Sequence, residues 1–245
     1  MNEHPAGWLH PPDLKSATAI QREIAAAVEM VDRIGRVTRV AGADTSMKWR
    51  DSRGPIHAAI ACDDGIVGQA TRIPPFPYVP GYLGFRECPA LVAAWETLAD
   101  KPDLILMDGQ GRAHPRRCGV GCQLGVLLDV PTIGVAKSLL CGALEGVLGD
   151  AVGSSAPIVD RGEVVAMAVR LRARAMPVYV SIGHRVSLET AVDWVLRLSD
   201  GRRIPPPVRA AHDAANAVRR GAASVEAGSG DATPSPNPLP QGGEG

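Results

Sequence analysis

The sequence predicts an α/β fold, in which a mixed sheet is flanked by helices within a single domain. Short continuous apolar runs such as 104–108 are typical of strands buried on both faces. Two alternating runs around the turn at 63–65 indicate an antiparallel hairpin. Segments with apolar residues at helical spacing separate the later strands, as expected for helices that cover a sheet.

The first half of the chain supplies one helix, the hairpin and a long loop. Thr18 and Gln21 have the spacing of a capping box, and Pro89 suits the first turn of a second helix. The predicted elements are a helix over 18–34, strands over 37–44, 56–62 and 66–73, an irregular Pro/Gly-rich loop over 74–84, and a helix that begins near Glu87 and ends before Lys101.

The second half alternates strands and helices. Its predicted elements are a strand over 104–108, a helix around 115–128, strands over 132–135, 163–171 and 178–181, and helices over 187–198 and 209–220. From Gly221 the chain has few apolar side chains, so we expect a disordered Gly/Pro/Ser-rich tail over 221–245. The folded domain is then 15–220, preceded by an N-terminal extension over 1–14.

Composition excludes several classes of protein. The 26 basic and 26 acidic residues give a net charge of zero, which argues against general coating of nucleic acid but permits a local basic groove. No run of 18 apolar residues and no secretion signal is visible, so we expect no membrane association. The five thinly spread cysteines indicate reduced thiols and a cytoplasmic location.

Three acids stand where chemistry often occurs in α/β proteins. Asp44 and Asp108 each end a predicted strand, and Glu87 opens the helix after the long loop. Converging carboxylates are oxygen ligands that suit Mg²⁺ or Mn²⁺, and such ions promote phosphodiester hydrolysis. The alternative for each acid is structural, because these positions also suit turn and cap residues or a helix dipole.

Basic residues follow two of the predicted strands. The stretch 108–117 (DGQGRAHPRR) places a histidine and three arginines after a strand-end acid, and guanidinium groups bind phosphate well. A solvated basic turn is the alternative. Lys137 follows another apolar strand and either lines the same crevice or extends to solvent. His114, Cys118 and Cys122 lack the second cysteine pair typical of structural zinc.

The chain has few aromatic residues, yet four of its nine lie within 76–85. A proline-stiffened loop can hold a ring that wedges between nucleic-acid bases. We expect Tyr78, which lies between two prolines, to be exposed in this role. Phe85 is expected to pack beneath the loop instead.

Several ordered motifs together resemble the endonuclease V family of deoxyinosine 3′ endonucleases. The resemblance spans most of 15–220 and rests on 77–87 (PYVPGYLGFRE), 108–117, 124–137 (LGVLLDVPTIGVAK) and 179–188 (YVSIGHRVSL). It implies an RNase H-like fold and deoxyribonuclease V activity in DNA repair. Such an enzyme uses Mg²⁺, with Mn²⁺ as a substitute, to hydrolyse the second phosphodiester 3′ to deoxyinosine, leaving 3′-hydroxyl and 5′-phosphate ends.

The resemblance also implies roles for individual residues. The metal site would consist of Asp44, Glu87 and Asp108, with Lys137 at the scissile phosphate and His212 acting through a metal-bound water. The DNA- and lesion-binding residues would be Tyr78, Pro80, Tyr82, Leu83, Gly84, Gly109, Gly111, His114 and Arg116. The base pocket would use backbone groups, which the glycines at 109 and 111 would leave open to a base.

The sequence departs from the family pattern at Met47, Gln123 and 205–209, none of which is a proposed ligand. Two other functions stay open: a nuclease for inosine-containing RNA, and an inosine-binding module with impaired catalysis. The presence of all three acids favours an active enzyme. We expect a monomer whose partner is deoxyinosine-containing DNA.

Overall fold

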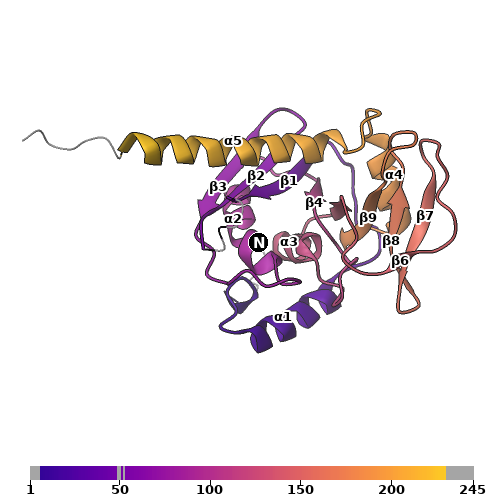
Figure 1. The fold of residues 1–245 in the computed structure, drawn as a ribbon, viewed down its shortest axis with the longest axis horizontal. Helices are drawn as coiled ribbons and strands as arrows, with labels where there is room; N and C mark the ends of the chain where they lie inside the picture. The colour runs from indigo at the N-terminus through magenta and orange to yellow at the C-terminus, as the bar shows by residue number, and fades with distance from the viewer. Residues whose placement is uncertain (1–5, 49–50, 52, 230–245) are drawn as a thin grey trace, which may run out of the picture.

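The computed structural model describes residues 6–48, 51 and 53–229, which form one α/β domain around a mixed sheet (Figure 1). In chain order its strands are β1 (Val40–Ser46), β2 (Ile56–Cys62), β3 (Val67–Arg72), β4 (Leu104–Asp108), β5 (Thr132–Ala136), β6 (Ala143–Leu144), β7 (Ser155–Asp160), β8 (Glu163–Val169) and β9 (Val178–His184). They lie in the order β3-β2-β1-β4-β5-β9-β8-β7-β6. The predicted α/β class, with a mixed sheet in a single domain, is confirmed.

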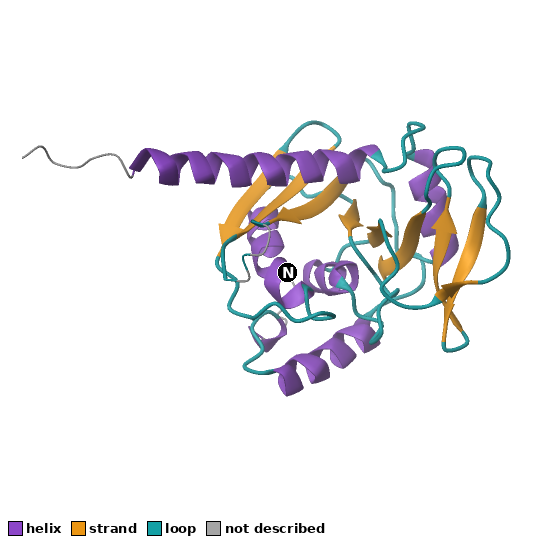
Figure 2. Ribbon diagram, viewed as in Figure 1, coloured by secondary structure: helices purple, strands orange, loops and turns teal. Residues whose placement is uncertain are grey.

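Helices cover both faces of this sheet (Figure 2). They are the short 3-10 helix η1 (Ala6–Trp8), α1 (Leu14–Ala27), α2 (Gly84–Glu96), α3 (Val120–Leu128), α4 (Leu188–Arg197) and α5 (Pro206–Ser229). On one face, α2 and α3 bury the odd-numbered apolar residues of β1 and β4. On the other face, α4 and the start of α5 bury the even-numbered ones. Successive side chains of a strand point to opposite faces, so each strand contributes to both cores.

The parallel part of the sheet brings three strand ends to one edge. β1 pairs in parallel with β4, and β4 with β5, while the other neighbouring strands are antiparallel. Asp44 lies just beyond the β1–β4 ladder, Asp108 pairs with Val135 in β5, and Lys137 follows the last residue of β5. These three charged side chains therefore come from adjacent carboxyl ends.

The boundaries of the helices differ from the prediction, and hydrogen bonds explain the first case. The first helix begins at Leu14 because Asp13 accepts the amide of Ser16 at 2.7 Å, whereas Thr18 lies inside the helix and bonds the carbonyl of Leu14. It ends at Ala27, since Val28 is extended.

The other helix starts also shift. α2 begins three residues before Glu87, so Pro89 lies inside it, and α3 begins at Val120 instead of near 115. The two-residue β6 was not predicted, and neither was β7, which contains Pro157, a residue that is uncommon within strands.

Both ends of the folded part extend beyond the predicted domain. Trp8 packs against the core, and its carbonyl accepts a hydrogen bond from Gln123, so the residues described from Ala6 belong to the domain rather than to an extension. At the other end α5 continues to Ser229, nine residues past the predicted end of the domain at 220. Its alanine-rich 222–227 favours a helix, although the average composition of 221–245 does not. Residues 230–245 lie outside the described part.

The structure also bears on the expectation about membranes. Within the described residues, no helix combines the length and the apolar character needed to cross a bilayer.

Candidate active site

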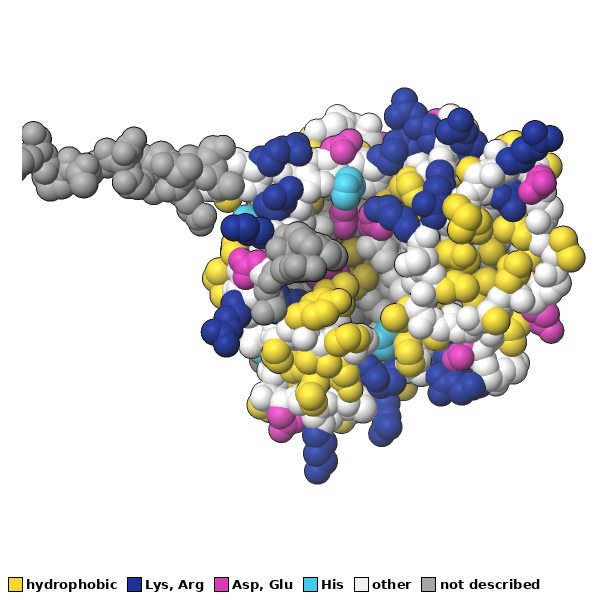
Figure 3. Space-filling view, in the orientation of Figure 1, with side chains coloured by type: hydrophobic (Ala, Val, Ile, Leu, Met, Phe, Trp, Pro, Cys, Tyr) yellow, Lys and Arg dark blue, Asp and Glu magenta, His cyan; other side chains and the backbone are white. Residues whose placement is uncertain are grey.

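Two aspartates and a histidine meet at the carboxyl edge of the parallel strands. Asp44 comes from β1, Asp108 from β4 and His212 from α5, and one ligand atom of each lies within 4.8 Å of the others. His212 Nδ1 is 2.8 Å from Asp44 Oδ2. In Figure 3 acidic side chains and a histidine border a hollow in this face, with Lys and Arg side chains beside them.

The two aspartates repel each other in the structure. Burial raises the pKa of Asp44 to about 6, and the negative charge of Asp108 adds to this effect. Hydrogen bonds from His212 and from the amide of Thr45 act in the opposite direction. Two carboxylates held this close offer the oxygen ligands that a divalent cation prefers, so the residues fit a Mg²⁺ or Mn²⁺ ion.

Glu87 lies beside this group but does not belong to it. It stands in the first turn of α2, on the opposite face of the sheet from α5, and burial raises its pKa to about 8. Its Oε1 accepts a hydrogen bond from Thr45 Oγ1 at 2.7 Å. Because Asp44 and Thr45 are consecutive in β1, they point to opposite faces, and Thr45 connects the strand to Glu87.

Lys137 pairs with Asp108 across the end of the sheet. Its Nζ lies 2.5 Å from Asp108 Oδ2, while 42% of the Lys137 side chain stays exposed. The ammonium group therefore reaches both the acidic cluster and solvent. The contact with Asp108 places the ammonium group beside the acids, but Lys137 does not line the neighbouring pocket, and its role in a crevice stays a prediction.

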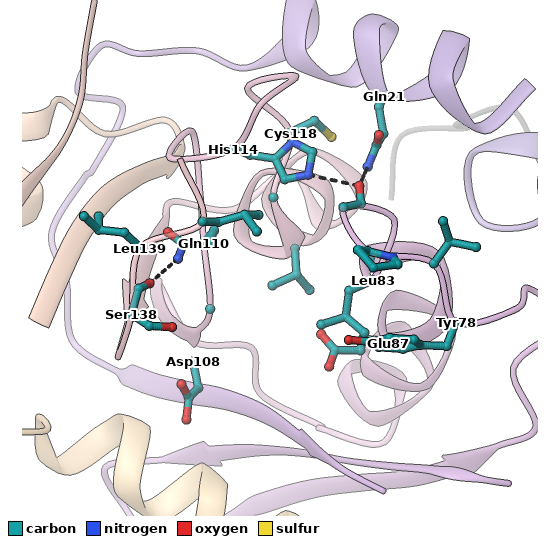
Figure 4. Close-up of a pocket in the computed structure, with 18 residues that line it drawn as sticks. Gln21, Tyr78, Leu83, Glu87, Asp108, Gln110, His114, Cys118, Ser138 and Leu139 are labelled. Carbon is teal, nitrogen blue, oxygen red and sulfur yellow. Dashed lines mark hydrogen bonds between the residues drawn. The ribbon is translucent and has the colours of Figure 1, made fainter. Parts of the chain in front are cut away.

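A pocket opens next to the acids, between the loop before α2 and the loop after β4 (Figure 4). Glu87 and Asp108 line one end of it in the close-up. Of the predicted lesion-binding residues, those that line the pocket are Tyr78, Pro80, Leu83, Gly84, Gly109 and His114. Tyr78 is 55% exposed, as expected, whereas Phe85 is fully buried.

The carbonyl of Gly81 fixes the pocket loop to the body of the domain. It accepts hydrogen bonds from Gln21 Nε2 at 3.0 Å and from Arg116 Nη2 at 2.6 Å. His114 Nδ1 accepts the amide of Arg116, so its proton is on Nε2, which lies 3.0 Å from the same carbonyl. Burial and the charge of Arg116 lower the pKa of His114 to about 4, which keeps the ring neutral.

Three predicted lesion-binding residues do not line the pocket. Arg116 stacks its guanidinium on the ring of Tyr82 at 4.1 Å, so both serve the loop's internal contacts. The amide of Gly111 donates to Ser181 Oγ, and a Cβ on Gly111 would lie 2.1 Å from the carbonyl oxygen of Ile182. That glycine is needed because the protein's own backbone approaches it.

The structure adds residues that the sequence prediction missed. The pocket also contains Gln21, Val79, Gly81, Gln110, Cys118, Gly119, Val120, Ser138, Leu139 and Leu140. Beside the acids lie Thr45, Ser46, Asn216 and Arg219. The helical spacing of 212, 216 and 219 puts Asn216 and Arg219 on one face with His212, but this spacing alone does not distinguish a site. Among the described residues His114, Cys118 and Cys122 form no metal-binding group.

Comparisons with known proteins agree on one family. The sequence model of the family described as endonuclease V matches residues 22–213. The protein called endonuclease V in Rhodospirillum centenum is 50% identical over 221 residues, covering 88% of this chain and 92% of that protein.

Solved structures extend this likeness to the fold. The crystal structure of endonuclease V from Streptomyces avermitilis has a TM-score of 0.80 at 37% identity, covering 89% of this chain and 97% of that one. Endonuclease V from Ciona intestinalis, in complex with a 23mer DNA containing an inosine followed by a ribo-adenosine, has a TM-score of 0.70 at 27% identity. That comparison covers 86% of this chain and 97% of that one.

Proposed function

This chain belongs to the endonuclease V family, and we propose that it repairs DNA by nicking the strand that contains deoxyinosine. It hydrolyses the second phosphodiester 3′ to the lesion and leaves a 3′-hydroxyl and a 5′-phosphate. The observation that carries the proposal is the continuity of the pocket with the acids, since Glu87 and Asp108 line the pocket and Asp108 also belongs to the group with Asp44 and His212. A base held in the pocket would keep its own strand next to the carboxylates.

The charged side chains of the site would have different roles according to their positions. Asp44 and Asp108 would hold a Mg²⁺ ion, with Mn²⁺ as a substitute, and His212 would assist from α5. A divalent ion bound there supplies polarisation of the phosphate and a lowered pKa for water. Glu87 borders the pocket and the acids, where it would help to orient the substrate strand. Lys137, which reaches both Asp108 and solvent, would stabilise charge that develops on the phosphate.

The pocket loop would recognise the lesion. The exposed ring of Tyr78 is suited to wedge beside a flipped base, while Pro80, Leu83, Gly84 and Gly109 form walls close to backbone groups. His114 and Arg116 would contribute indirectly, because they bond the carbonyl of Gly81.

One gel tests the proposal. A 5′-labelled duplex with a single deoxyinosine is incubated with the protein and Mg²⁺, with the matched adenine duplex and EDTA as controls. We expect a product that ends one nucleotide past the lesion, extendable by a polymerase and absent with EDTA. Asp108→Asn should bind the lesion duplex but leave it intact. Failure to nick with both Mg²⁺ and Mn²⁺ would contradict the proposal.

The same gel assay tests a second substrate. The Ciona complex contains a ribonucleotide directly after the inosine, which supports inosine-containing RNA as the alternative substrate. Faster cleavage of an RNA strand of the same sequence would favour it. The monomeric state and the cytoplasmic location stay predictions, the latter based on the cysteine pattern.

A further inference from the structure

α5 lies along β1 so that polar residues of the two elements match in spacing. Asp44 and Ser46 are two apart on the strand and share one face, while His212, Asn216 and Arg219 share one face of the helix. Two strand residues and four helix residues span similar lengths, roughly 6–7 Å.

The close approach of α5 to β1 depends on a glycine. A Cβ on Gly42 would lie 1.8 Å from the carbonyl oxygen of Pro207, which leaves no room for any side chain at this position.

These residues form a continuous hydrogen-bonded series. Arg219 Nε is 2.9 Å from Ser46 Oγ, and Ser46 Oγ is 2.8 Å from Asn216 Oδ1. Asn216 Nδ2 is 3.0 Å from His212 Nε2, and His212 Nδ1 is 2.8 Å from Asp44 Oδ2. Arg219 Nη2 also approaches Asn216 Oδ1, at 3.4 Å.

The orientation of the Asn216 amide sets the direction of the hydrogen bonds in the series. Its Nδ2 donates to the carbonyl of His212 at 3.0 Å and its Oδ1 faces Arg219 Nη2, so Oδ1 accepts from Ser46, whose hydroxyl in turn accepts from the Arg219 guanidinium. The amide of Asn216 must then present its NH₂ to His212 Nε2, which accepts. The remaining ring proton is on Nδ1 and points to Asp44, which as a carboxylate only accepts.

We propose that Asn216, held by Ser46 and Arg219, is a positioning residue that fixes His212 as the Nδ1–H tautomer and thereby orients the carboxylate of Asp44. Both ring nitrogens are then engaged, so His212 acts on the metal site through Asp44 and not as a direct ligand. The inference deepens the proposed function, because it assigns the support of the same metal site. Such outer partners of metal ligands commonly control metal affinity.

The first test observes the tautomer without DNA or metal. Long-range ¹H–¹⁵N NMR spectra of the labelled full chain show which ring nitrogen carries the proton, and loss of a signal in His212→Gln assigns it among the six histidines. We expect Nδ1–H in the native protein. In Asn216→Asp a carboxylate faces Nε2 and should draw a proton onto it, whereas Ala217→Asp adds the same charge on the exposed side and should change nothing. A native Nε2–H tautomer would overturn the proposal.

The second test measures metal binding directly. Electron paramagnetic resonance counts free Mn²⁺ during titration, and we expect Asn216→Leu to weaken binding about tenfold. Ala217→Leu is the matched control, with affinity unchanged. Equal affinity of Asn216→Leu and the native protein would also overturn the proposal. Neither test uses a substrate, so failure of deoxyinosine cleavage would leave both results interpretable.

Discussion

The ammonium group of Lys137 lies 2.5 Å from Asp108 Oδ2, across the ends of two parallel strands. The pairing of Asp108 with Val135 sets this contact, because Lys137 is two residues beyond that partner. The lysine is thus a cation fixed beside the acids by sheet register. A phosphate approaching the pocket would meet this charge next to the carboxylates of Asp44 and Asp108.

Replacing Lys137 should therefore impair the chemical step more than metal binding. For Lys137→Met we expect the single-turnover rate on deoxyinosine DNA to fall about 10²- to 10³-fold, as for loss of one charge-stabilising donor. Mn²⁺ affinity should stay equal or rise, since a competing cation is removed from Asp108. Lys15→Met, an exposed change on α1, serves as the control. An unchanged rate would remove Lys137 from the reaction.

Tyr78 should matter for recognition and not for the metal. Tyr78→Ala removes a ring that is 55% exposed at the pocket. Stacking of a base on an aromatic side chain contributes about 1–3 kcal/mol, so we expect roughly tenfold weaker binding of the lesion duplex in a fluorescence assay with Ca²⁺. Val147→Ala, at a 92% exposed position, should bind normally. Equal affinity of the two variants would exclude the wedge role.

The sequence predicted that Asp44 and Asp108 lie near each other, because strand ends in a parallel sheet are local signals, while their role as metal ligands stays a prediction. Asp44 and Asp108 follow apolar runs that predict strands. Because β1 and β4 are parallel neighbours, these two residues come close together although they are far apart in sequence. His212 was placed only by the resemblance. Its partner Asn216 was not predicted, because a polar residue on a helix that is expected to be exposed has no distinguishing pattern until the facing strand is known.

The role of Gly111 shows the opposite case. A glycine beside an acid suggests room for a ligand, yet the structure fills that room with the backbone at Ile182. Likewise, Arg116 in a basic cluster suggests phosphate binding, but its contacts are with Gln21, Gly81 and Tyr82. Composition identifies the chemistry of a side chain, whereas only tertiary contacts show which partner satisfies it.

Arg116 should then act through the loop. Arg116→Met removes a charge-assisted hydrogen bond to Gly81, a contribution of about 1.5–3 kcal/mol in comparable cases. We expect weaker binding of the lesion duplex with unchanged binding of the adenine duplex and of Mn²⁺. Arg172→Met, an exposed change, is the control. If Arg116→Met weakens binding to both duplexes equally, the side chain contacts the DNA backbone instead.

Glu87 is buried and lies beside the acids, so replacing it with glutamine should raise the stability of the protein while lowering its nicking activity. The pKa of Glu87 is about 8 in the folded protein, against an ordinary value of 4.5, chiefly because of burial. The folded state binds this proton more tightly than the unfolded chain does. The stability that results is therefore complete below about pH 4.5 and is lost as pH rises through about 8.

Glu87→Gln cannot ionise and keeps an oxygen for the hydroxyl of Thr45. We expect the metal-free variant to be more stable than the native protein at pH 8.5, by about 4 kcal/mol, and to lie within about 1 kcal/mol of it at pH 5. Urea unfolding at the two pH values measures this difference, and the gel assay should show strongly reduced nicking. Glu96→Gln, at an exposed position in the same helix, should leave both properties unchanged. If the free energies of unfolding of Glu87→Gln and the native protein change equally with pH, this carboxyl ionises as freely in the folded protein as in the unfolded chain. Its burial would then cost little, because another group compensates its charge.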